Sequence, residues 1–147
     1  MIADSFAIAA AWAQALANDL ALAQFCQERF EKAPAILLGF PQGEQPGQRE
    51  TPYVAVIPVK DEDGPEMGTA TQVVLVACGF VDKQIVNSGS VEALRAFESA
   101  RLFDQLVQDV LVATDYPPSR REAELANPGK GFFERLSFHE IDQDSTL

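Results

Sequence analysis

The sequence is poor in basic residues, histidine and cysteine. Its 147 residues include 11 lysines and arginines against 22 aspartates and glutamates, which gives a formal net charge of −11. This negative charge opposes stable binding to DNA or to an anionic membrane, because both are held largely by lysine and arginine. It suits a soluble protein, a basic partner, or a surface that must not adhere to nucleic acid.

His139 is the only histidine, which excludes a metal site built on several imidazoles. Its run SFHEI, with Phe138 and Ile141 nearby, favours an ordinary strand residue over a general base. Cys26 and Cys78 each lie in an apolar stretch, without a CxxC spacing or a neighbouring histidine. The pattern predicts two buried, reduced thiols in a cytoplasmic protein, and no metal or other cofactor.

The sequence has no long uninterrupted apolar run. The stretch FAIAAAWAQALA resembles the core of a secretory leader, but no lysine or arginine precedes Arg29, and Gln14 and Asn18 interrupt it. A leader begins with positive charge, and a membrane span needs about 18 apolar residues. The stretch therefore predicts a helix, and we expect no membrane partner.

Residues 5–32 keep helical spacing of their apolar side chains and predict one bent helix or two shorter ones. Asp4 or Ser5 would cap the first segment and Asp19 a second. Pro34 stops the pattern, residues 35–40 (AILLGF) predict a short buried strand, and 41–50 predict a loop.

Residues 52–59 (PYVAVIPV) and 71–81 (TQVVLVACGFV) are strand-like runs with apolar side chains on both faces. The loop between them, 60–68, is shorter than the dozen or so residues that a parallel crossover needs, which favours an antiparallel pair. Pro58 has no N–H and is expected at a sheet edge or just past the last paired residue.

The second half of the chain predicts a long helix that starts at Ser88 or Ser90 and ends before the Tyr116-Pro-Pro turn. Ser119 and Glu122 have capping-box spacing and predict a short helix that the Asn-Pro-Gly at 127–129 ends. Residues 131–141 predict a last strand, and 142–147 a frayed acidic tail.

The element order α-β-β-β-α-β indicates an α+β fold, in which a mostly antiparallel sheet of about four strands is packed by two long helices in a single domain, residues 1–147. An antiparallel sheet usually leaves one face to water. Here both faces are apolar. Either the helices cover opposite faces, or both lie on one face and another subunit covers the second.

The sequence carries no catalytic motif. Its glycines form neither GxGxxG nor a P-loop. The acidic residues of loop 60–68 lack the ligand spacing of an EF-hand and favour a solvated loop. We therefore expect a binding or assembly component and not an enzyme.

Five segments taken together resemble small phage tail proteins of the tail-terminator or tail-completion type. They are FCQERFEKAPAILLGF, the Pro/Gly/Glu loop, ETPYVAVIPV, the acidic turn and VVLVACGFVD. The resemblance covers residues 1–113 in element order and is carried by 25–82. It implies an α+β fold, no catalytic residues, and a ring, typically a hexamer, that caps the tail tube. The protein would assemble in the host cytoplasm, contact other tail or neck proteins and reside in the virion tail.

Under this resemblance, the next protomer of the ring would cover the second apolar face. The residues expected at that subunit interface are Tyr53, Val54, Val56 and Pro58. An acidic lumen would let DNA pass without stable binding, because carboxylates repel phosphates. The residues expected at the lumen or rim are Asp61, Glu62, Asp63 and Glu66, with Glu44 and Glu50 behind them.

Two other classes fit the composition. A small acidic inhibitor, such as an immunity protein, would bind a basic partner by complementary charge and remain a monomer or dimer. An enzyme or small-molecule binder would need a large enclosed pocket between the helices, beside His139 and several carboxylates.

Overall fold

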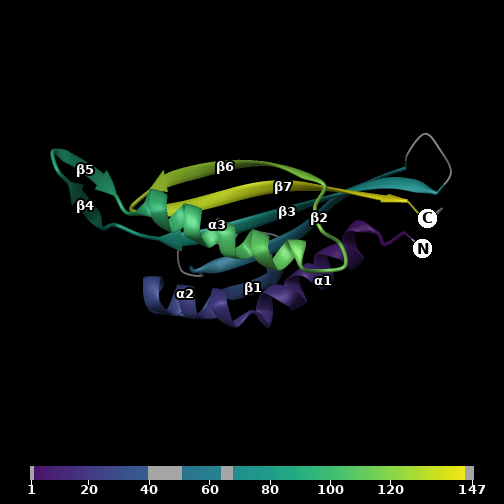
Figure 1. The fold of residues 1–147 in the computed structure, drawn as a ribbon, viewed down its shortest axis with the longest axis horizontal. Coiled ribbons are helices and arrows are strands. Elements are labelled where there is room, and N and C mark those ends of the chain that lie inside the picture. Colours follow the sequence, from purple (N-terminus) through teal and green to yellow (C-terminus); the bar gives the residue numbers. More distant parts are fainter. Residues whose placement is uncertain (1, 40–50, 64–67, 145–147) are drawn as a thin grey trace.

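The computed structural model describes residues 2–39, 51–63 and 68–144. Within these ranges the chain forms a five-stranded sheet in the order β1-β2-β3-β7-β6, a separate hairpin of β4 and β5, and three helices (Figure 1). The elements are α1 (Ser5–Ala17), α2 (Leu20–Phe30), β1 (Ala35–Leu38), β2 (Tyr53–Asp63), β3 (Thr69–Val81), β4 (Ile85–Ser88), β5 (Val91–Leu94), α3 (Ala96–Val112), β6 (Arg120–Gly129) and β7 (Phe132–Asp144).

The N-terminal region forms two helices, the second of the two predicted arrangements. The Asp4 carboxylate accepts a hydrogen bond of 2.7 Å from the Ala7 N–H and caps α1. Asp19 caps α2 in the same way, at 2.9 Å from the Leu22 N–H. These side chains satisfy N–H groups that have no partner inside the helix. Both caps agree with the sequence.

The sheet confirms the α+β fold. β2, β3, β7 and β6 pair antiparallel, while the short β1 pairs parallel to β2. The strand predicted at 35–40 is present over Ala35–Leu38, and the antiparallel pair of apolar strands is present as β2 and β3.

β2 and β3 are longer than predicted, because Lys60 to Asp63, expected in a loop, continue β2 and pair with β3. Pro58 pairs with Val74, beside a bulge in the strand. Pairing with β1 ends at Val56. Pro58 therefore lies at the outer edge of β2 as far as the described residues extend, which is the first of its two predicted positions.

Residues 85–94 form a hairpin, and the helix predicted from Ser88 or Ser90 begins only at Ala96. Gly89, with a φ of 63°, and Ser90 make a two-residue turn between β4 and β5, and such a turn suits the strand twist. Val91 and Leu94, which precede α3, have the helical spacing of its apolar residues only by coincidence. The predicted end of the helix, before Tyr116, is confirmed.

The short helix predicted from the capping-box spacing is wrong, because Arg120–Gly129 is strand β6, paired with β7. Its side chains alternate, with Arg121, Ala123 and Leu125 on the helix-covered side of the sheet. The final strand is confirmed, and Asp142 to Asp144, predicted as part of a frayed tail, belong to it.

All three helices pack on one face of the sheet (Figure 1). They enclose a core whose largest fully buried members are Trp12, Phe80, Phe103, Phe133, Ile8, Leu16, Leu22, Leu111, Val54 and Val56. No helix of the described residues lies over the opposite face. Of the two arrangements left open by the sequence, the described helices adopt the second, in which they all lie on one face.

Both cysteines are buried free thiols, as predicted, and burial raises the pKa of Cys26 to about 12. Within the described ranges no single helix is long and apolar enough to cross a membrane, although α1 and α2 together, bent by 64° at their junction, have the necessary length and composition.

Candidate functional site: the sheet face opposite the helices

The sheet face without helices, here called the open face, carries a second apolar layer. Strand alternation and register direct the following side chains to it: Ala35, Leu37, Tyr53, Ala55, Ile57, Val73, Leu75, Ala77, Phe132, Leu136 and Phe138. Tyr53, Ala55 and Ala77 are 0% exposed and Val73 is 7% exposed, Phe138 is 41% exposed, and the other six are half-buried. An apolar sheet surface of this kind is typical of an interaction site.

Tyr53 lies across Gly79 on the open face. A Cβ on Gly79 would stand 2.1 Å from the Tyr53 ring, so only glycine leaves room for it. The Tyr53 hydroxyl donates a hydrogen bond to the carboxylate of Glu134, which is itself buried. Three neighbouring strands, β2, β3 and β7, are thereby joined on this face by one aromatic side chain.

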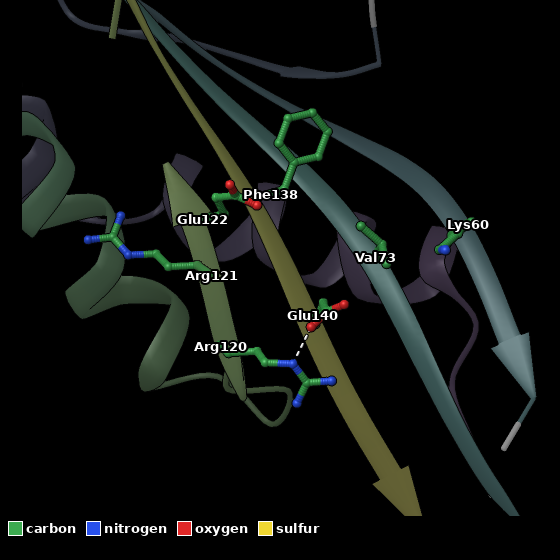
Figure 2. Close-up of a pocket in the computed structure, with 7 residues that line it drawn as sticks. All are labelled: Lys60, Val73, Arg120, Arg121, Glu122, Phe138 and Glu140. Atoms are coloured by element: carbon green, nitrogen blue, oxygen red, sulfur yellow. Dashed lines mark ion pairs between the residues drawn. The ribbon is translucent and has the colours of Figure 1, made fainter. Parts of the chain in front are cut away.

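A shallow depression of about 540 Å³ interrupts the apolar layer near β6 (Figure 2). Val73 and Phe138 supply its apolar lining, and the charged lining residues are Lys60, Arg120, Arg121, Glu122 and Glu140. Arg120 pairs with Glu140 and, at 2.8 Å, with Asp142. The depression therefore brings together three basic and two acidic side chains.

Arg121 points to the opposite side of β6 from Arg120, toward α3 (Figure 2). Its two terminal nitrogens bind the two oxygens of Asp104 at 2.7 and 2.9 Å, and Arg135 Nε approaches the same carboxylate at 3.3 Å. Asp104 is buried on α3. This bidentate pair ties the helix layer to the sheet.

His139 lies in the core with 0% of its surface exposed, so the prediction of a structural strand residue is confirmed. Its ring meets Trp12 edge-on at 5.4 Å, Nε2 is bonded to Gln108 and Nδ1 to the Ser137 carbonyl. Burial, together with the nearby charge of Arg121, lowers the pKa of His139 from 6.5 to about 4. His139 lines neither the depression beside Phe138 nor the one beside Asp109 on α3.

The unfolded chain takes up a proton on His139 near its ordinary pKa of 6.5, but the folded chain does so only near 4. Between these values the unfolded state binds more protons, so stability is expected to fall with falling pH. Urea unfolding at pH 7 and pH 4 should show a loss roughly 3 kcal/mol larger in the native chain than in His139→Gln. Equal pH dependence in the two chains would contradict this assignment.

The β4–β5 hairpin projects from one end of the sheet (Figure 1), and all its strand residues are exposed. Asp82, 3% exposed, fixes its root by accepting hydrogen bonds from Arg95 Nε at 2.9 Å, Ser99 Oγ at 2.6 Å and the Gln84 N–H at 3.1 Å. Burial alone would raise the pKa of Asp82, but these hydrogen bonds outweigh it and hold the pKa below its ordinary range.

The structure separates the four residues predicted at a subunit interface. Val54 and Val56 are 0% exposed in the core beneath the helices, so a partner on the open face would not contact them. They face the helices because side chains alternate along β2, and Tyr53, on the other face, is likewise 0% exposed in the single chain. Tyr53 belongs to the open face and Pro58 to the outer edge of β2; their contact with another subunit stays a prediction.

The predicted acidic loop is mostly strand. Asp61 accepts hydrogen bonds from the Ser5 N–H at 2.7 Å and the Ser5 hydroxyl at 2.8 Å, and so supports the start of α1. Glu62 pairs with Lys60 at 3.3 Å, and Asp63 pairs with Ala70 across the ladder. A lumen position for these residues stays a prediction. Glu44, Glu50 and Glu66 lie outside the described residues.

Sequence reasoning missed the hairpin and the depression. The sequence did contain a turn signal for the hairpin, since Asn87-Ser-Gly-Ser lies between two valine-containing runs. The alternation of charged residues and alanine in RREAEL signalled strand β6, which borders the depression. Across the described part of the chain, no group of three or more His, Cys, Asp or Glu residues could hold a metal ion.

The fold is thus a one-sided α+β arrangement, three helices on one face of a five-stranded sheet. No protein-family model and no curated protein sequence matches the chain. Among solved structures it is similar to a chain from the virion of native gene transfer agent (GTA) particle, with a TM-score of 0.55, 17% sequence identity and 92% coverage of each chain. At this identity the similarity shows a shared fold.

Proposed function

We propose that this chain is a non-enzymatic structural protein of a phage-like virion, of the tail-terminator or tail-completion type, that assembles as a hexameric ring at the end of the tail tube. The observation that carries the proposal is the open face, an apolar sheet surface over which no helix of the described residues lies. The shared fold with a virion chain supports it, since the similarity spans nearly the whole of both chains.

In this proposal the protein acts in the virion tail, after assembly in the host cytoplasm, and contacts its own copies and neighbouring tail or neck proteins. Head-to-tail contacts between identical copies close into a ring when the rotation between them permits. The net charge of −11 suits a lumen through which DNA passes without stable binding. Asp61, Glu62 and Asp63, at the far end of β2, remain the proposed lumen or rim residues among those described.

The test is the mass of the purified protein by light scattering and native mass spectrometry. We expect a closed oligomer, and we expect Phe138→Glu to weaken association at least about thirtyfold, because it places a charge in an apolar interface. Val112→Glu is the matched control, since Val112 is exposed at the end of α3 and should not affect the mass.

A folded native chain that stays monomeric at high concentration would contradict the ring. If that monomer or a dimer instead captured one basic protein tightly, the acidic-inhibitor hypothesis would replace it. Circular dichroism of both variants checks that a change in mass does not reflect unfolding.

A further inference from the structure

The β4–β5 hairpin, residues 85–94, is here called the arm (Figure 1). Its two strands pair only with each other in the described structure. The Arg95 N–H donates to the Gln84 carbonyl at 2.9 Å. Because hydrogen-bonded pairs alternate along an antiparallel ladder, the N–H and C=O groups of Ile85 and Asn87 point outward, away from β5. No other described residue bonds them, so the outer edge of β4 offers two donors and two acceptors.

The outer edge of β1, on the side away from β2, has the same arrangement. The N–H groups of Ala35 and Gly39 donate to β2 and to the residue before it, at 2.8 to 2.9 Å. In a parallel ladder, successive residues direct their N–H and C=O groups to opposite sides of the strand. The groups of Ile36 and Leu38 therefore point away from β2, and no other described residue bonds them. β1 and β4 thus offer backbone groups with the same spacing.

The other described edges of the five-stranded sheet carry features that oppose strand pairing. β6 has a bulge between Ala126 and Gly129 and four charged side chains among its first five residues. The part of β2 beyond β1 contains Pro58, a bulge and a charged run that ends at Asp63. Proline, bulges and charge protect an edge against another strand. β1 and β4 contain no proline, no charged residue and no shift of register.

The charge distribution favours a second copy as the partner of these edges. The chain has a net charge of −11, so identical copies repel one another. Contact between them costs least where neither surface is charged, and β1 and β4 are two such strands. A basic protein would gain no charge complementarity from either strand.

The root of the arm holds it in one direction. Asp82 accepts hydrogen bonds from the Gln84 N–H, Arg95 Nε and Ser99 Oγ, which join the two ends of the arm to α3. A segment that is already fixed loses less entropy when a partner binds. A two-stranded hairpin is only marginally stable by itself in water, so a further strand from outside the chain stabilises the arm.

We propose that β4 of one copy pairs antiparallel with β1 of the next copy, so that the arm extends the neighbour's sheet. The two four-residue strands pair over their full length. Leu38, 43% exposed in the single chain, then lies opposite Ile85, which is 57% exposed, and Leu37 lies opposite Val86. Main-chain hydrogen bonds supply the affinity of such an added strand, and the alternate side chains supply its specificity.

This inference rests on the proposed ring and specifies one of its subunit contacts. The strand that is added and the edge that receives it are different surfaces of the chain. Such a head-to-tail contact repeats from copy to copy, as a closed ring requires.

The first experiment links the two strands covalently. The chain with Leu38→Cys and Ile85→Cys is oxidised under assembly conditions. In the proposed pair their Cα atoms are about 5.5 Å apart, within the reach of a disulfide. We expect a ladder of covalent multimers ending at the size of the ring, while a mixture of the two single variants gives covalent dimers. Cys26 and Cys78 are buried and do not compete.

The matched control for the link combines Leu38→Cys with Leu94→Cys. Leu94 is exposed, and it lies opposite Ile85 on β5, one strand further from the neighbour's β1. Two strand spacings amount to about 10 Å, beyond the reach of a disulfide. This pair should stay unlinked.

The second experiment removes one backbone donor. The Asn87 N–H points outward, so Asn87→Pro leaves the hydrogen bonds inside the arm intact but removes a bond to the next copy. Association should weaken at least about tenfold, as measured by light scattering. Glu92 lies opposite Asn87 and directs its N–H to the outer edge of β5. Glu92→Pro is therefore the control and should leave the assembled mass unchanged. Circular dichroism checks that both variants fold.

The outcomes separate this inference from the proposed ring. If the chain assembles but the Leu38–Ile85 pair forms no link, or if Asn87→Pro assembles as well as Glu92→Pro, the strand pairing fails and the ring proposal survives. Links through Leu94 in place of Ile85 would also overturn the pairing of β4 with β1. If no self-association occurs, both proposals fail.

Discussion

Replacement of Gly79 by alanine is expected to lower the free energy of unfolding by at least about 3 kcal/mol. The added Cβ would lie 2.1 Å from Cε2 and 2.2 Å from Cζ of Tyr53. The ring has no free space to move into, because it is fully buried and its hydroxyl is bonded to Glu134. Urea unfolding followed by circular dichroism measures the loss.

The control for this prediction is a double-mutant cycle. In a Tyr53→Ala chain the ring is gone, and Gly79→Ala should then cost less than about 1 kcal/mol. If Gly79→Ala does not fold at all, recovery of folding by the added Tyr53→Ala gives the same answer. Equal costs in both backgrounds would show that the Tyr53 ring does not impose glycine at this position.

Two neighbouring arginines in β6 are expected to differ sharply in their contribution to stability. Arg121→Gln removes the bidentate partner of the buried Asp104 and should cost about 3 kcal/mol, because a buried carboxylate loses most of its compensation. Arg120→Gln removes ion pairs with Glu140 and Asp142 on exposed surface, and should cost less than about 1 kcal/mol.

Because Arg120 and Arg121 share a strand and a chemistry, the pair of variants controls for strand propensity and net charge. Thermal unfolding at two salt concentrations adds a second readout, since salt screens the exposed pairs of Arg120 more than the pair that Arg121 makes with the buried Asp104. Similar losses for both variants would contradict the assignment of Arg121 to the helix-facing side.

The elements whose signals are local were predictable from the sequence. Asp4 and Asp19 precede apolar helical patterns and cap both helices as expected. The valine-rich runs around Val54 and Val76 formed the central antiparallel pair. Their two apolar faces also indicated, before any coordinates, that the sheet needs cover on both sides. The structure shows that the helices supply only one of these covers.

The errors arose where two local signals competed. Val91 and Leu94 continue the helical spacing of α3, but the Gly89 turn and pairing with β4 make them a strand. Ser119 and Glu122 have capping-box spacing, yet the neighbouring residues alternate with period two and pair with β7. In both cases pairing with a partner strand overrode helix propensity.

The open face could be predicted only in part. Alternation along β2 assigns Tyr53 and Val54 to opposite faces of the sheet. It does not show which of the two faces the helices cover. The need for glycine at position 79 depends on a tyrosine from the neighbouring strand, which no single-strand pattern reveals. The depression combines residues of β2, β3, β6 and β7, so it exists only once the register is set.

Hydroxyl-radical footprinting across the association range tests most directly whether copies of this chain cover the open face. We predict that oxidation of Phe138 on the open face falls sharply as the protein assembles, while oxidation of Phe6 on α1 stays constant. Assembly that leaves Phe138 as reactive as in the monomer would contradict the account, because the copies would then meet through another surface.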